Sequence, residues 1–222
     1  MTAARKLVAE GLGTLLLVAA VVGSGIMGVN LAGGNLAIAL LANTLATAAA
    51  LVTLILVFGP ISGAHFNPVV TLVAALRGEL APAMAIGYAT VQIAGAIAGA
   101  VLANVMFDLD PVAWATTERT GAPKLASEVV ATFGLVGVVI VVSRVRPAAV
   151  PFAVAGFITA AYWFTASTSF ANPAVTLGRA FSDTFTGIRP SDVPLFVAAQ
   201  LGGGLLALGV FGWLVRPLPS RA

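Results

Sequence analysis

The sequence predicts an all-α membrane protein, in which six transmembrane helices and two re-entrant half-helices form an inverted repeat of three plus three spans. Composition indicates the class, because 59% of the 222 residues are hydrophobic and only 9% are charged. A soluble domain carries about a quarter charged residues. Six long apolar stretches and two Asn-Pro segments indicate the architecture. The net charge of +3 is small and scattered, which argues against a nucleic-acid partner.

Each of the six long stretches is close to the ~20 residues that a helix needs to cross the hydrocarbon core. They are residues 7–29, 35–58, 83–107, 125–142, 148–167 and 193–215. The first lacks a small-residue cleavage site with a mature domain behind it. We therefore interpret it as a retained span and not as a signal peptide.

Two further apolar stretches, residues 67–76 and 172–181, are too short to cross. Both begin with Asn-Pro, at Asn67-Pro68 and at Asn172-Pro173. Proline suits the first turn of a helix, so these pairs predict two short helices that begin inside the membrane.

Basic residues in the loops predict the orientation, because cytoplasmic loops carry an excess of Lys and Arg. With the N-terminus inside, the cytoplasmic residues are Arg5, Lys6, Arg77, Arg144, Arg146, Arg216 and Arg221. The residues outside are Arg119, Lys124, Arg179 and Arg189. Both termini are then cytoplasmic, and the longest loop, 108–124, lies outside.

The two halves of the chain, about 1–110 and 120–222, resemble each other within one domain, 1–222. Glu10-x-x-x-Thr14 matches Glu128-x-x-x-Thr132. The segment around Asn67 matches the one around Asn172, and Gln92 matches Gln200. Three spans in each half make the second half enter the membrane from the opposite side, which is an inverted-topology repeat. The two Asn-Pro helices then meet near the midplane, where non-helical backbone is tolerated only if it is buried or lines a wet cavity. The region of Asn67 and Asn172 is therefore expected to line a pore.

These elements resemble the aquaporin, or major intrinsic protein, family over the whole chain. Two Asn-Pro motifs, Asn67-Pro68-Val69 and Asn172-Pro173-Ala174, lie between the correct spans of an inverted repeat. Helix N-termini that face one point produce a positive potential that repels cations and offers N–H donors to neutral solutes. One departure is Val69, where the family's first motif usually has Ala. The resemblance implies a homotetramer with one pore per subunit, no cofactor and no catalytic residues.

The resemblance also locates a selectivity filter, by spacing from the two motifs. The inferred filter residues are Thr47, Ala160, Ser169 and Val175. Many relatives have Arg at the position of Val175, with aromatic residues elsewhere in the filter. We therefore expect a wide aperture without a charged or aromatic side chain. Arg179 lies one turn beyond Val175, roughly on the same face, and is expected to contact the vestibule or a loop rather than the pore.

Val in place of the filter Arg resembles a bacterial subgroup that is associated with arsenic resistance. This resemblance implies passive passage of arsenite, methylated arsenicals and other small neutral solutes across a bacterial inner membrane, and water is a further candidate permeant. The alternative is a channel mainly for water or glycerol. A proton-coupled transporter using Glu10 or Glu128 and a non-transporting scaffold or receptor are more distant alternatives.

Other polar residues fit bracing roles. An intramembrane carboxylate suggests a function, and the family resemblance implies that Glu10 and Glu128 accept hydrogen bonds from the re-entrant loops. His65, the only histidine, is expected to brace a loop or to line the pore. One His without any Cys argues against a metal site, and the sequence has no nucleophile–base pair that would indicate an enzyme. The expected partners are neutral solutes and membrane lipid.

Overall fold

The computed structural model describes residues 1–216, so the predicted cytoplasmic Arg221 lies outside the described residues. Among these residues, six helices have the length and apolarity to cross a membrane, two of them together with the 3-10 turns, Pro147–Ala149 and Pro190–Asp192, that precede them. They are α1 (Ala3–Leu31), α2 (Leu36–Ser62), α4 (Pro82–Met106), α5 (Ala122–Val145), α6 (Val150–Phe164) and α8 (Val193–Leu214). The predicted fold class is confirmed. One boundary is wrong: the fifth span ends at Phe164 and not at residue 167, because Thr165 is already extended.

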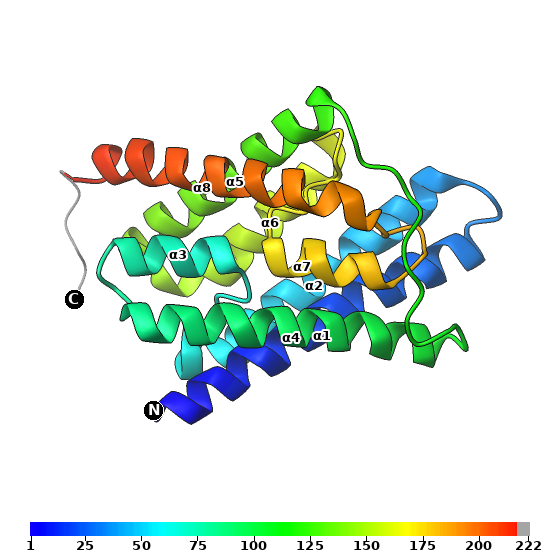
Figure 1. Cartoon of the computed structure of the whole chain (residues 1–222). Coiled ribbons are helices and arrows are strands. Elements are labelled where there is room, and N and C mark those ends of the chain that lie inside the picture. The colour runs from blue at the N-terminus through cyan, green and yellow to red at the C-terminus, as the bar shows by residue number, and fades with distance from the viewer. Residues whose placement is uncertain (217–222) are drawn as a thin grey trace.

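The two half-helices lie end to end between the long helices, as Figure 1 shows. They are α3 (Pro68–Leu76) and α7 (Pro173–Gly178), and a 3-10 turn, Arg179–Phe181, extends α7. The side-chain oxygens of Asn67 and Asn172 cap the first N–H groups of these helices, and proline occupies the first turn. This local chemistry explains why both short helices begin where they do.

Glycine at helix crossings sets the spacing within each half. A Cβ at Gly95 or Gly99 of α4 would overlap the backbone carbonyls of Gly11 and Leu15 on α1. A Cβ at Gly203 of α8 would likewise overlap the carbonyl of Val129 on α5. Such close backbone approach is typical of membrane helix interfaces, which small residues permit.

Each half-helix also packs against a long helix from the other half of the chain. Helix α7 of the second half lies against α4 of the first, and α3 lies against α8. Helices α2 and α6 pack together across the boundary between the halves. The start of α1 and the end of α8 lie at the same end of the bundle (Figure 1). The long helices surround the two re-entrant loops, and side chains of α1, α2, α5 and α6 line a cavity beside those loops.

Candidate pore

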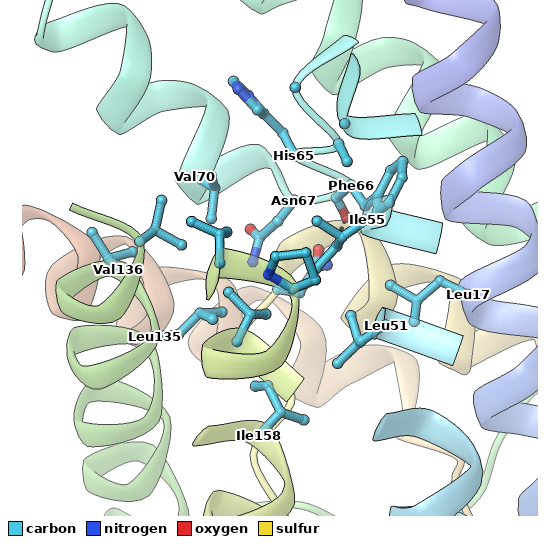
Figure 2. Close-up of a pocket in the computed structure, with 18 of the residues that line it drawn as sticks. Leu17, Leu51, Ile55, His65, Phe66, Asn67, Val70, Leu135, Val136 and Ile158 are labelled. Atoms are coloured by element: carbon cyan, nitrogen blue, oxygen red, sulfur yellow. Dashed lines mark hydrogen bonds between the residues drawn. The ribbon is translucent and has the colours of Figure 1, made fainter. Parts of the chain in front are cut away.

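A cavity of about 590 Å³ runs past both Asn-Pro motifs. Apolar side chains from the long helices form most of its wall, including Leu17, Leu51, Ile55, Leu135 and Ile158 (Figure 2). We define the inner mouth by His65, Arg77 and Glu79, which line the end of the cavity nearer the start of α1. We define the outer mouth, at the other end, by Thr47, Tyr162 and Arg179.

Asn67 and Asn172 both line this cavity, and each amide binds the opposite half. The Asn67 Nδ2 donates to the carbonyl of Ala171 (2.7 Å), and the Asn172 Nδ2 donates to the carbonyl of Phe66 (2.7 Å). Each amide has a second N–H donor, for which the described residues provide no acceptor. One donor of each asparagine therefore ties the two loops together, and one is left for a molecule in the cavity.

Left-handed backbone turns the chain sharply in both loops. The φ angles of Ala64 and Phe66 are 50° and 49°, and those of Ser169 and Ala171 are 52° and 48°. A non-glycine residue in this region is uncommon and persists where surrounding contacts enforce it. The same conformation at equivalent positions of both loops shows that the inverted repeat extends to the backbone.

Two buried glutamates supply those contacts. The Glu10 carboxylate accepts hydrogen bonds from the backbone N–H groups of His65 (3.0 Å) and Phe66 (2.7 Å). The Glu128 carboxylate accepts them from Phe170 and Ala171, both at 2.9 Å. Both glutamates are fully buried, so these bonds replace the water that a free carboxylate would need.

A glutamine orients each glutamate. The Gln92 Nε2 bridges Glu10 and Thr71, and the Gln200 Nε2 bridges Glu128 and Thr176. Ser62 adds a hydroxyl donor to Glu10 at 2.6 Å. Neither glutamate lines the cavity, so their geometry is that of loop braces.

Three of the four predicted filter residues, Thr47, Ser169 and Val175, line the cavity. The Ser169 hydroxyl is buried and has no hydrogen-bond partner among the described residues. A buried hydroxyl without a protein partner is free to bond to a molecule in the cavity. The part of the cavity around Ser169 and Val175 therefore offers a neutral hydroxyl beside an apolar side chain.

The prediction for Ala160 is wrong. Ala160 is exposed on the outside of α6 and does not line the cavity. The face of α6 that lines it carries Val150, Val154, Ile158 and Tyr162, which are four residues apart and therefore lie along one side of the helix. The expectation of a filter without an aromatic side chain is also wrong. Tyr162 lies next to the filter residue Thr47, with 3.3 Å between their hydroxyl oxygens.

His65 lies in the cavity wall at the inner mouth and also braces its loop (Figure 2). Its Nδ1 is 3.1 Å from the Thr71 hydroxyl, and its ring packs edge-on against Tyr88 with 5.4 Å between ring centroids. The structure thus gives this histidine both of the roles that the sequence left open.

Comparison with known proteins identifies the family that the chain matches. The family profile of the major intrinsic proteins matches residues 1–148. The chain is 55% identical to "Aquaglyceroporin AqpS" of Rhizobium meliloti (strain 1021), covering 96% of this chain and 91% of that protein. It is 31% identical to "Aquaporin TIP1-2" of Zea mays, covering 92% and 84%.

The chain belongs to the major intrinsic protein family. Its fold also matches the X-ray structure of the aquaglyceroporin from Plasmodium falciparum, with a TM-score of 0.73, 20% identity and 98% coverage of both chains. As a major intrinsic protein it is an integral membrane channel and not an enzyme.

The unusual Val69 of this major intrinsic protein fits into a space that a glycine provides. Val69 is buried at the start of α3, and a Cβ at Gly204 of α8 would overlap its Cγ1. The extra methyl groups therefore lie against the bare backbone of α8. They leave the capping bond from the Val69 N–H to the Asn67 Oδ1 intact at 2.9 Å.

The sequence did not predict that three residues belong to the outer mouth: Tyr162, Phe170 and Arg119. Arg179, expected against the vestibule or a loop, is buried in the cavity wall and stacks on Phe170. Arg119 reaches the other loops of the mouth through carbonyls 48 to 68 residues away in the sequence. The sequence carries no local signal for contacts at that separation.

Proposed function

We propose that this major intrinsic protein is a passive channel for small neutral solutes larger than water, with arsenite and methylated arsenicals among them. The observation that carries the proposal is the place of Val175. Val175 lines the cavity, as Ser169 does, and its spacing from Asn172 is that of the filter arginine in many relatives. A short apolar side chain there leaves room that a guanidinium would fill.

The chemistry of the wall favours neutral solutes. The polar groups that the cavity offers between its two mouths are the amides of Asn67 and Asn172 and the hydroxyl of Ser169. All are uncharged, and the rest of the wall there is apolar. A solute with a few hydroxyl groups can form several of these bonds in turn without the cost of shedding the hydration shell of an ion.

Glycerol and the neutral hydroxides of trivalent arsenic share this chemistry, since each combines a few hydroxyl groups with a compact, uncharged body. A methylated arsenical adds an apolar face, which suits the apolar wall. The printed name of the rhizobial relative, an aquaglyceroporin, supports a solute of glycerol size. A channel mainly for water or glycerol is the alternative, and Tyr162 favours it by narrowing the side on which Ala160 was expected.

Coupled transport has less support. A proton relay needs a carboxylate that the pathway can reach, whereas Glu10 and Glu128 lie outside the cavity wall and bind loop N–H groups. We therefore propose flux that follows the solute gradient alone.

The remaining parts of the proposal concern the setting of the channel. We propose a homotetramer with one pore per subunit, in which residues 1–222 form a single domain. Both termini face the cytoplasm of a bacterium, and the protein lies in the inner membrane. The excess of Lys and Arg in the loops of that side supports this orientation.

Stopped-flow light scattering on proteoliposomes tests the proposal, with glycerol and a neutral arsenical as osmolytes and sucrose as the impermeant reference. We expect the wild type to pass both solutes. Val175→Arg should slow both at least about tenfold, which corresponds to about 1.4 kcal/mol of barrier. Val175→Leu is the matched control, because it adds bulk without a guanidinium and should slow them much less.

Two results would contradict the proposal in different ways. A wild type that passes water but neither larger solute would refute the wide aperture and the arsenical substrate, while leaving a water channel. A Val175→Arg variant with unchanged flux would show that residue 175 does not form the constriction.

A further inference from the structure

The outer mouth holds a positive charge that the filter itself lacks. Val175 contributes no charge, yet Arg179 lies one turn further along and lines the same cavity with only 3% of its surface exposed. The end of α7 positions it. A Cβ at Gly178 would approach the backbone carbonyl of Ala96 at 2.7 Å, so the last turn of α7 presses directly on α4.

An aromatic ring and one carbonyl hold the Arg179 guanidinium. Its central carbon lies 3.4 Å from the centroid of the Phe170 ring, and its Nε donates to the carbonyl of Thr186. Stacking on a ring face is favourable for a guanidinium and leaves its edge free. The described residues provide no acceptor for its two terminal nitrogens, so these donors remain available to the cavity that the side chain lines.

A second arginine supports the first. The Arg119 guanidinium lies 4.8 Å from the centroid of the same ring and donates to the carbonyls of Ser167, Phe185 and Gly187. These bonds join the loop before Phe170 to the loop that contains Thr186, the partner of Arg179. Arg119 is therefore a positioning residue, and it adds a second charge near the mouth.

Neither charge is neutralised by an ion pair. The salt bridges among residues 1–216 join Arg77 to Glu79, and Arg189 to Glu118 and Asp192. Burial lowers the pKa of Arg119 to about 10, an effect that the charge of Glu128 partly opposes, so the side chain stays charged at neutral pH. Unpaired charge in a partly buried site acts on a nearby ion far more strongly than charge in water.

We propose that Arg179, positioned by Phe170 and Arg119, is the cation barrier of this channel in place of the absent filter arginine. The barrier lies one helical turn outside Val175, so it repels cations without narrowing the aperture. Size selection at Thr47, Tyr162, Ser169 and Val175 is thereby separated from charge selection at Arg179. The inference rests on the proposed passage of neutral solutes, and it does not depend on arsenicals being among them.

Urea and guanidinium provide the test, because they have nearly the same size and shape and differ in charge. Uptake of each into proteoliposomes is measured for the wild type, Arg179→Gln, Arg179→Lys and Arg119→Gln. We expect the wild type to pass urea and to exclude guanidinium. Arg179→Gln should raise the guanidinium-to-urea ratio at least about tenfold, Arg179→Lys should stay near the wild type, and Arg119→Gln should show a smaller rise.

Arg189→Gln is the matched control, since it removes a partly exposed, ion-paired arginine of the outer loops that does not line the cavity. Its guanidinium-to-urea ratio should equal that of the wild type. An unchanged ratio in Arg179→Gln would overturn the inference and assign cation exclusion to the half-helix N-termini. So would a loss of urea flux in both Arg179→Gln and Arg179→Lys, because Arg179 would then act only as a structural brace. Urea flux in the wild type separately tests the neutral-solute channel.

Discussion

The two re-entrant regions of the molecule are alike where they hold the loops in place and different where they face the two mouths. In both, a buried glutamate accepts two loop N–H groups and a glutamine bridges that glutamate to a threonine. In both, an asparagine caps its own half-helix and donates to the opposite loop. These hydrogen bonds fix the positions of the two loops near the midplane, so the repeat is symmetric there.

The positions that face the mouths have lost this symmetry. His65 in the first region corresponds to Phe170 in the second, and Ala74 corresponds to Arg179, each pair being 105 residues apart. The inner mouth therefore has an imidazole and an exposed Arg77–Glu79 pair, whereas the outer mouth has a stacked, unpaired guanidinium. Bracing and selectivity thus reside in different residues, and each can be changed separately.

The largest expected effect comes from breaking the braces, and it should be unequal between the halves. In Glu10 each oxygen accepts two of the four donors, whereas Oε1 of Glu128 accepts only Phe170 N–H. In Glu128→Gln the new NH2 group can face that single backbone donor, whereas in Glu10→Gln it faces the His65 N–H and the Ser62 hydroxyl, which must then rotate and give up its own hydrogen bond to residue 10. With about 1–3 kcal/mol for each unsatisfied buried group, we expect Glu10→Gln to lower the midpoint of thermal unfolding more than Glu128→Gln.

Thermal unfolding in detergent, followed by glycerol flux of the folded fraction, measures this difference. Glu79→Gln is the control, because its carboxylate is in a surface ion pair that contributes about 0–1 kcal/mol. Equal losses at Glu10 and Glu128 would show that the number of donors does not govern the stability of these loops.

A smaller effect is expected where the first motif departs from the second. Gly204→Ala places a methyl group against Val69 and should destabilise the protein by about 1–3 kcal/mol through overpacking. Val69→Ala makes the first motif resemble the second and leaves a void beside Gly204. The double variant should recover most of the stability that Gly204→Ala loses, because the two side chains share one space.

Gly209→Ala is the control on the same helix, since a Cβ there meets nothing within 4 Å. It should leave the unfolding midpoint unchanged or raise it, as Ala favours a helix over Gly. Additive losses in the double variant would show that Val69 and Gly204 do not compensate each other.

The sequence was sufficient for the parts of the molecule that depend on local chemistry or on the repeat. The Asn-Pro pairs begin both half-helices at the predicted residues, and the match of Gln92 with Gln200 corresponds to equivalent hydrogen bonds in the two halves. The prediction that Ala160 lies in the filter failed because the position was found by counting residues back from Asn172 through a loop. Left-handed residues at Thr168 and Ser169 compact that loop, and an apolar residue on every side of α6 gives no polar contrast to reveal which face lines the cavity.

The outer mouth could not be predicted for a different reason. Arg119 and Arg179 meet at the Phe170 ring from separate parts of the chain. Their positions depend on carbonyls of loops whose course follows from tertiary packing. Only the spacing of Arg179 from Val175 was visible in the sequence, and it indicated a face without indicating what the side chain contacts.

The smallest effect is expected from removing either of two tyrosine hydroxyls, one next to the first re-entrant loop and one at the outer mouth. Tyr88 is fully buried and donates to the carbonyl of Ser62 at 2.8 Å, next to the first loop. Tyr162 lies 3.3 Å from the Thr47 hydroxyl in the cavity wall. Tyr88→Phe leaves a buried carbonyl without its donor and should cost about 1 kcal/mol. Tyr162→Phe should cost less, because water in the cavity can replace the lost bond at Thr47, while glycerol flux should change by no more than about twofold, equivalent to about 0.4 kcal/mol of barrier. A larger loss of stability in Tyr162→Phe than in Tyr88→Phe would show that the Thr47–Tyr162 contact braces the bundle, and that the outer mouth is not specialised for selection alone.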